Sequence, residues 1–173
     1  MKKFNLQLFA EAVQGKSIIY LFRVLGDNNA ATAMAFTTEN ERSKSKDADV
    51  TATKDGSIRT PGAAEIEISA TAILAKDDDL AEKLEAAMDS DTLIEIWEAN
   101  LEKKGTANST FKGTYYQGYL TEFTLTSSAE EHAEYECTFS INGSGAKGDV
   151  TVSAEQQAVA TYVFTDTTAK TGA

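Results

Sequence analysis

Apolar and polar side chains alternate with a period of two in two neighbouring segments, residues 119–125 and 134–141, and this pattern is typical of β-strands. Alternation of this kind places every second residue on the same strand face. Asn142-Gly143 follows the second segment and predicts a tight turn. The predicted faces are Tyr119, Thr121, Phe123 and Leu125 against Leu120, Glu122 and Thr124 in the first strand, and Tyr135, Cys137, Phe139 and Ile141 in the second.

Strands are also predicted elsewhere in the chain, at residues 17–25, 32–38, 65–74, 149–153 and 158–165. The first of these is apolar on both faces, which favours a central strand. The segment 92–104 fits either a helical stripe or a strand. In the third predicted strand, the residues expected to point inward are Ile66, Ile68, Ala70, Ala72 and Leu74.

One helix is predicted, from Leu80 to about Met88, within the range 79–89. Asp77-Asp78-Asp79 precedes it, and such side chains cap helix N-termini and suit the helix dipole. We expect Asp79 to pair with Lys83, four residues further on. The predicted apolar stripe consists of Leu80, Leu84, Ala87 and Met88.

A long polar segment separates the predicted strands between residues 39 and 62. Its first part, residues 39–49, is almost wholly polar and carries both signs of charge. Asp55-Gly56 is a strong hairpin-turn signal, so we expect a polar extension with a short hairpin at its tip. Loops this long inside a compact domain are usually functional or disordered. This segment is therefore the strongest candidate for a contact element.

Composition limits the function classes. The chain has 173 residues, a formal net charge of −11 and a pI near 4.5, which fit one domain and give no electrostatic footprint for nucleic acid. No apolar run is long enough to cross a bilayer, and the N-terminal stretch is too weak for a signal peptide. The single cysteine cannot form an internal disulfide, which fits a reducing cytoplasm.

No residue pattern indicates catalysis, a cofactor or a metal, so we do not expect an enzyme. His132 lies in a polar connection and is interpreted as a solvated loop residue. Cys137 alternates with aromatic residues and is interpreted as a core thiol. Asp77-Asp78-Asp79 lacks the spacing of an EF-hand loop. The segment 92–104 contains three glutamates, Glu95, Glu98 and Glu102. On a strand, only Glu98 and Glu102 would share a face, so a catalytic pair of carboxylates is the weaker interpretation.

The run KGTYYQGYLTEFTLTSSAEEHAEYECTFSINGSG, preceded by IEIWEANLEKKG and by the opening FNLQLFAEA, resembles the major tail proteins (tail tube proteins) of phages with long, non-contractile tails (siphophages). The resemblance implies a mainly β fold with one α-helix (α+β), a β-sandwich or open barrel with a long polar loop and terminal arms. It places a strand at 92–104. It also implies hexameric rings whose sheets join into a continuous inner β-barrel, stacked through the long loop.

Carried onto this chain, the resemblance divides it into an arm at residues 1–15, a tube domain at 16–165 with a stacking loop at 40–62, and a tail at 166–173. Mixed charges in the loop suit docking between rings. The inter-subunit arm would use Phe4, Leu6, Leu8 and Phe9. The inter-ring candidates are Arg42, Lys44, Lys46, Asp47, Asp49, Lys54, Asp55, Gly56 and Arg59.

The expected partners follow from the same resemblance. They are further copies of the chain, a tail-tip initiator, a tape-measure protein and a tail terminator, with viral DNA passing through the lumen unbound and no membrane. The expected location is the virion tail, after assembly in the host cytoplasm. An acidic lumen wall would repel DNA and avoid sticking.

Two alternatives stay open at this point. An extracellular β-sandwich binding module, such as an adhesin or a carbohydrate-binding domain, would use Tyr115, Tyr116 and Tyr119 as a stacking platform. A tube protein of a contractile tail or secretion system would share the fold and differ in needing a sheath.

Overall fold

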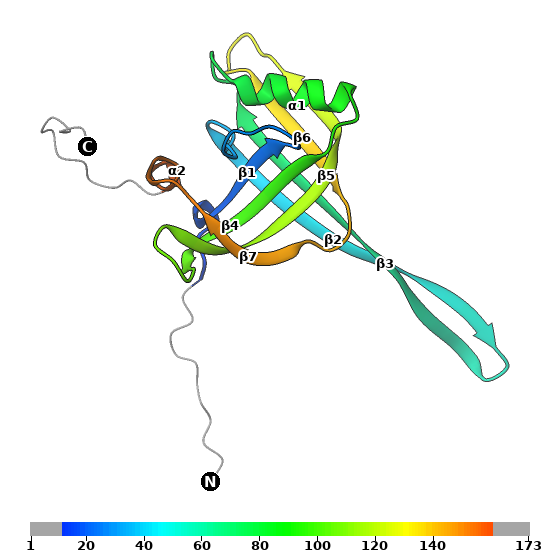
Figure 1. The fold of residues 1–173 in the computed structure, drawn as a ribbon. Coiled ribbons are helices and arrows are strands. Elements are labelled where there is room, and N and C mark those ends of the chain that lie inside the picture. Colours follow the sequence, from blue (N-terminus) through cyan, green and yellow to red (C-terminus); the bar gives the residue numbers. More distant parts are fainter. Residues whose placement is uncertain (1–11, 161–173) are drawn as a thin grey trace, which may run out of the picture.

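The computed structural model describes residues 12–160, and its main feature is one antiparallel sheet with the strand order β1-β4-β5-β6-β3-β2, in which β7 pairs with part of β5 (Figure 1). The mainly β fold with one principal helix, predicted from the sequence, is confirmed. The elements are the 3-10 turn Gly15–Ser17, β1 Ile18–Val24, β2 Thr37–Thr53, β3 Gly56–Ile73, α1 Asp79–Asp89, β4 Ile94–Lys104, β5 Thr110–Thr126, β6 Glu134–Ile141, β7 Ala146–Thr151 and α2 Ala154–Ala160.

Strand β5 changes partners along its length and so joins two parts of the sheet. One edge pairs with β4 from Phe111 to Gly118. The opposite edge pairs first with β7, up to Tyr115, and then with β6, from Gly118 to Thr126. The partner change at Gly118 divides the sheet into a part formed by β1, β4, β7 and the first half of β5, and a four-stranded part with the order β2-β3-β6-β5.

The main core lies between the curved sheet and α1, which lies across one end of it (Figure 1). Arg42 on β2 reaches Glu98 on β4, although three strands separate β2 from β4 in the sheet order. The sheet therefore curls toward an open barrel around this core. Its fully buried large side chains include Phe22, Ile68, Leu84, Ile94, Ile96, Tyr135, Cys137 and Phe139.

A second, smaller apolar cluster covers the other face of the sheet, over β1, β4 and β7. Its buried members are Leu21, Ala99, Phe111, Val150 and Val152. β1 is buried on both faces, as its sequence predicted, with Tyr20 and Phe22 in the main core and Leu21 in the second cluster. The predicted central position was wrong, because β1 lies at one end of the sheet order and pairs with β4 alone apart from the single bridge between Phe22 and Thr32.

Helix α1 begins as its sequence predicted, because Asp78 is its N-cap and accepts a hydrogen bond from the Ala81 amide at 3.2 Å. The inward stripe is confirmed except at Met88, which is 36% exposed. The expected Asp79–Lys83 pair was wrong. Lys83 instead lies 3.4 Å from Asp27, in the turn after β1, and this ion pair ties the helix to the sheet.

Several predicted elements differ from the structure. The predicted strand 32–38 contributes only a bridge between Thr32 and Phe22 before β2 begins at Thr37. Residues 154–160 form α2, so the predicted strand 158–165 was wrong at its start, and its remainder lies outside the described residues. The expected tight turn at Asn142-Gly143 is a longer connection from 142 to 145. Leu74 is exposed because β3 ends at Ile73.

The predicted faces of β5 were wrong for a local reason. Its pairing with β6 shifts by one residue between Leu120 and Glu122, and such a β-bulge reverses the alternation beyond it. Leu120 and Phe123 therefore both turn toward the core, while Tyr119 is 41% exposed on the opposite face. In β6, which has no bulge, the predicted inward face is confirmed.

The polar segment 39–62 is part of one long β-hairpin, with a register shift between Lys46 and Ala48, and not a loop with a short hairpin at its tip. Strands β2 and β3 pair from Thr37–Ala72 to Thr53–Gly56, and the turn consists of two residues, Lys54 and Asp55. We call residues 46–64 the projecting hairpin, because β3 pairs with β6 only from Ile66 onward. It extends away from the sheet on the side opposite α1 (Figure 1).

Candidate assembly interface

The four-stranded part β2-β3-β6-β5 has two open edges. Within residues 12–160, β2 pairs only with β3, so its outer edge has no partner strand. In the same described range, β5 from Tyr119 to Thr126 pairs only with β6, because its pairing with β4 stops at Gly118. Unpaired strand edges are templates for pairing with another chain. Because neighbouring strands are antiparallel throughout, β2 and β5 run in opposite directions and can continue the same alternation between copies.

The outer edge of β1 differs from these two edges, because its own chain partly covers it. The amide of Phe22 donates to the Thr32 carbonyl at 2.8 Å, and the Thr32 amide donates back at 2.9 Å. A covered edge is a usual protection against unwanted strand pairing. The structure thus leaves both edges of the four-stranded part open, whereas Thr32 covers part of the outer edge of β1.

One face of this four-stranded sheet, the acidic face, carries glutamates without any lysine or arginine. Residues paired directly across strands share a face, and this face is the one opposite the buried Ile66, Ile68, Ala70 and Ala72. Six of its glutamates are exposed and Glu134 is half-buried. Its acidic members are Glu39, Glu41, Glu65, Glu67, Glu122, Glu134 and Glu136, and the other residues of this face are serines, threonines, Tyr119 and, at the end of β3, Ile73.

The glutamates of the acidic face never lie directly opposite one another. Along one row of the sheet, the order is Glu39, Thr71, Glu136 and Thr124. Along the next row, it is Glu41, Ser69, Thr138 and Glu122. Like charges directly opposite destabilise a strand pair, so this spacing allows a dense acidic surface on a stable sheet.

The core side of the same sheet carries the basic residues of β2. Arg42 Nε lies 2.6 Å from Glu98 Oε2, and the Tyr20 hydroxyl donates to the same oxygen at 3.0 Å. Burial and the neighbouring Glu98 carboxylate raise the pKa of Tyr20, so its hydroxyl keeps its proton. Arg42 is thus engaged within its own chain and fixes the base of the hairpin against β4.

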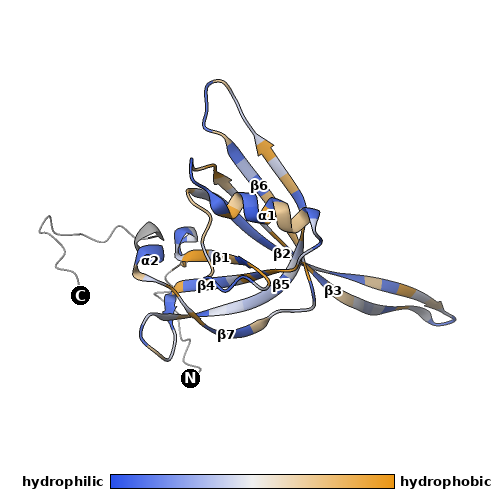
Figure 2. Ribbon diagram, turned by 45° about the horizontal axis from the view of Figure 1, so that its top comes forward, coloured by the Kyte–Doolittle hydropathy of each residue, from blue (hydrophilic) through white to orange (hydrophobic). Residues whose placement is uncertain are grey.

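The projecting hairpin is exposed at every residue except Gly62 and Ala64, and it carries both signs of charge and two large apolar side chains. Eight residues of β2, 46–53, span about 25 Å at the usual rise per residue. Val50 is 54% exposed and Ile58 is 59% exposed. Val50 pairs with Arg59, whereas Ile58 pairs with the next residue, Thr51, so the two apolar side chains lie on opposite faces. Figure 2 shows the resulting mixture of hydrophilic and hydrophobic positions.

The structure brings most of the predicted inter-ring residues together on this hairpin. Lys54 and Asp55 form its turn, and Gly56 follows with φ of 140°. Arg42 and Lys44 lie outside the projecting part, where β3 is also paired with β6. Lys46, Asp47, Asp49 and Arg59 lie along it. The predicted arm residues Phe4, Leu6, Leu8 and Phe9 lie outside the described residues.

Sequence reasoning missed a cluster on the sheet face opposite the main core. Arg23 on β1 lies 2.7 Å from Glu95 on β4 and also stacks over Trp97 at 5.0 Å. Tyr115 on β5 donates to Glu95 at 2.7 Å. Burial favours the protonated form of Glu95, but the hydrogen bonds from Arg23 and Tyr115 outweigh it and lower its pKa. Glu95 is a buried structural anion.

The tyrosine platform of the alternative binding module does not form. Tyr116 is buried in the main core, whereas Tyr115 and Tyr119 point to the opposite face. Tyr115 is also held by Glu95 and accepts a hydrogen bond from Gln117 at 2.6 Å. Three rings on two faces of a strand cannot stack on one sugar.

The remaining candidates for chemistry have structural roles. Cys137 is fully buried, and burial raises the pKa of its thiol to about 12. His132 is exposed in the connection before β6. Glu98 and Glu95 lie on opposite faces and are each bound by an arginine and a tyrosine. Within residues 12–160, no cluster of three ligating side chains could hold a metal ion.

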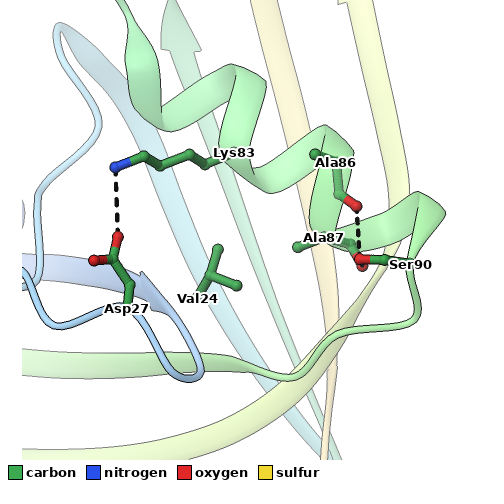
Figure 3. Close-up of a pocket in the computed structure, with 6 residues that line it drawn as sticks. All are labelled: Val24, Asp27, Lys83, Ala86, Ala87 and Ser90. Atoms are coloured by element: carbon green, nitrogen blue, oxygen red, sulfur yellow. Dashed lines mark hydrogen bonds and ion pairs between the residues drawn. The ribbon is translucent and has the colours of Figure 1, made fainter.

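The residues that line a shallow groove between α1 and the end of β1 also have structural roles. Figure 3 shows the Lys83–Asp27 ion pair at one end and Ser90 at the other, where the Ser90 hydroxyl donates to the Ala86 carbonyl at 2.8 Å. Val24 and Ala87 lie between them. These contacts fix the helix to the sheet and leave no reactive group directed into the groove.

Comparison with known proteins decides the family. The family model described as phage tail tube protein matches residues 12–147. The chain belongs to the phage tail tube protein family. A protein of Staphylococcus phage phiMR25 that is described as a tail protein is 37% identical over 156 residues, covering 87% of this chain and 80% of that protein.

Two solved structures share the fold. The SPP1 tail tube superposes with a TM-score of 0.71 and 15% identity over 86% of this chain and 84% of that chain. The tail of an empty gene transfer agent particle, refined with C6 symmetry, gives a TM-score of 0.61 and 15% identity over 78% and 98%. The tube protein described here is a structural component of a phage tail. No helix within residues 12–160 is long and apolar enough to span a membrane.

Proposed function

We propose that copies of this tube protein form closed rings by pairing the outer edge of β2 with the edge of β5 from Tyr119 to Thr126 in the next copy. The observation that carries the proposal is a four-stranded sheet with two open, oppositely directed edges and a basic-free acidic face. Using a different edge on each partner makes the contact heterologous, and rotation can then close a ring. Closure leaves no edge of the four-stranded part unpaired. Six copies follow from the family resemblance and agree with the symmetry of the gene transfer agent tail.

In such a ring, the acidic face lines the lumen. The opposite face of the same strands is occupied by the core and α1, so it cannot face an open channel. A wall of glutamates repels the phosphates of DNA and lets it pass without binding. The lysines and arginines of β2 point away from the lumen, because Arg42 and Lys44 pair with the buried Ile68 and Ile66.

The projecting hairpin carries the contact between rings. It continues the direction of strands β2 and β3 beyond the sheet, so it leaves a ring toward the next one (Figure 1). An isolated two-stranded hairpin is at best marginally stable in water. Val50 and Ile58 on its two faces, with mixed charges between them, suit insertion between two protein surfaces. Head-to-tail stacking of this kind generates a filament.

The proposed assembly partners follow from this geometry and from the family resemblance. Fixing a free hairpin costs about 1–2 kcal/mol per residue, and a docked hairpin recovers that cost. Assembly is therefore slow without a template and faster on a tail-tip initiator, with a tape-measure protein setting length and a terminator ending growth. We place assembly in the host cytoplasm and assign the protein no enzymatic role.

Electron microscopy of the concentrated protein, beside light scattering at low concentration, tests the proposal. Hollow tubes or rings of uniform diameter are expected, and seeding with sonicated tubes should shorten the lag before they form. A chain that stays monomeric at every concentration tested contradicts the proposal and favours the binding-module alternative. A tube of a contractile system would bind a sheath protein, which a non-contractile tail lacks.

Charge reversal on the acidic face should make the tubes retain DNA. We expect Glu41→Lys/Glu67→Lys/Glu136→Lys to assemble and to hold duplex DNA that resists DNase, because lysines inside the lumen neutralise phosphates. The amount of DNA that sediments with the tubes should decrease by about tenfold or more when the salt concentration is raised from about 50 to 200 mM. The measurement is co-sedimentation of labelled DNA with tubes after nuclease treatment.

The matched control moves the same charges to α1, as Glu82→Lys/Glu85→Lys/Asp89→Lys, at positions that are exposed on the helix. DNA bound there lies outside the tube and should be digested. Complete digestion of the DNA on the first variant would show that the acidic face does not line the lumen.

A further inference from the structure

Phe36, immediately before β2, has the most exposed large apolar side chain within residues 12–157, at 65%. Its backbone has φ of 49°, a region that bulky residues rarely adopt. Two contacts hold this conformation: the Phe36 carbonyl accepts from the Ile73 amide at 3.2 Å, and the Thr37 hydroxyl donates to the Met34 carbonyl at 2.9 Å. The chain thus fixes an apolar ring in solvent at the beginning of an open edge.

Leu125 is the corresponding apolar residue on the other open edge. It is 56% exposed and lies one residue before the end of β5. It pairs with Tyr135, whose ring stacks on Phe123 at 6.0 Å between centroids. Leu125 therefore extends the apolar surface of the core to the rim of the sheet, where the described part of the chain leaves it uncovered.

The pairing register places these two residues at the same level of the sheet. Leu125 pairs with Tyr135, Tyr135 with Ala72, and Ala72 with Thr37, which follows Phe36 directly. Because β2 and β5 run in opposite directions, antiparallel pairing between copies brings the start of β2 next to the end of β5. If the pairing register between the two copies shifted by two residues, Phe36 and Leu125 would still be diagonal neighbours close enough for contact.

We propose that Phe36 of one copy packs on Leu125 of the next copy and forms an apolar clasp at one end of each strand junction in the ring. The clasp rests on the proposed ring and adds to it a specific contact. Backbone pairing alone tolerates slippage by two residues. An apolar pair at one end of the edge favours a single register and excludes water from the junction.

Cross-linking of Phe36→Cys/Leu125→Cys with a short bis-maleimide tests the contact. In assembled tubes, we expect a ladder of covalent products up to the full ring. The native Cys137 is fully buried and should not react. Each single variant should give no ladder, and a mixture of the two single variants should give dimers only, because each chain then carries one reactive site. Tubes of the double variant that yield only monomers overturn the clasp and leave the tube proposal intact.

Phe36→Gly provides a second test without added cysteine. Glycine adopts positive φ without strain, so the monomer should unfold within a few degrees of the wild-type temperature. The concentration needed for tube formation should rise at least tenfold. The matched control is Leu25→Ser, at a residue that is 43% exposed but lies away from both open edges. An unchanged assembly threshold for Phe36→Gly overturns the clasp. A wild-type chain that never assembles overturns the ring and the clasp together.

Discussion

Replacing residues 50–59 by Asn-Gly is expected to leave a folded protein that no longer forms long tubes. The replacement keeps the Asp49–Thr60 pair and closes it with a dipeptide that favours two-residue hairpin turns. The removed residues have no contact with the core, because all of them are exposed. The unfolding temperature should therefore change by only a few degrees, while the proposed inter-ring contact loses Val50, Ile58 and the charged turn.

Sedimentation velocity and electron microscopy of the truncated protein measure this outcome. Single rings that fail to stack are the expected product, at concentrations where the wild type forms tubes. Val50→Ser/Ile58→Ser is the graded control, since it keeps the hairpin and removes only its apolar side chains; it should raise the assembly threshold without abolishing tubes. Long tubes formed by the truncated chain would show that stacking uses another surface.

Gly118→Ala is expected to lower the stability of the fold strongly. A Cβ at this position would lie 2.4 Å from the Ser140 carbonyl oxygen, a backbone atom that cannot move aside. Gly118 also pairs with both Ile94 and Ile141, so a shift here disturbs two strand junctions. We expect a loss of about 3 kcal/mol in the free energy of unfolding, which lowers the unfolding temperature by about 6–12 °C in a domain of this size.

Gly148→Ala is the matched control, because it also lies in a strand that pairs with β5 but has open space where its Cβ would point. Thermal unfolding followed by circular dichroism should show little change, or a gain of about 0.5 kcal/mol from the less flexible unfolded chain. Equal behaviour of the two alanine variants would mean that the strand junction at Gly118 can relax.

The sequence predicted most of the core because burial there follows a simple period. Ile66, Ile68 and Ala70 on β3, and Tyr135 and Cys137 on β6, are buried as expected. The faces of β5 could not be predicted in the same way, since a bulge at Thr121 has no strong signature in single residues. Arg23, Glu95 and Trp97 were not recognised as a cluster because they come from strands that are distant in sequence.

The sequence indicates where the candidate contact element lies, between residues 39 and 62, but does not predict that it is a long hairpin. The run from Glu39 to Lys46 was interpreted as a polar loop because it lacks apolar residues. Its alternation is nevertheless regular, with Glu39 and Glu41 on one side and Arg42, Lys44 and Lys46 on the other. A strand that carries one sign of charge on each face does not match an apolar–polar template. Counting charge alternation would have predicted both the strand and the acidic face.

The continuity of β3 has a mechanical consequence. One uninterrupted strand runs from the turn of the hairpin at Gly56 to Ile73 beside the core. Tension on a docked hairpin acts along this strand, at right angles to its interstrand hydrogen bonds. The eight pairs between β3 and β6, from Ile66–Ile141 to Ile73–Glu134, would then be loaded together in shear and not opened one at a time. A tail that bends or is pulled would resist rupture through the same strand that positions its hairpin.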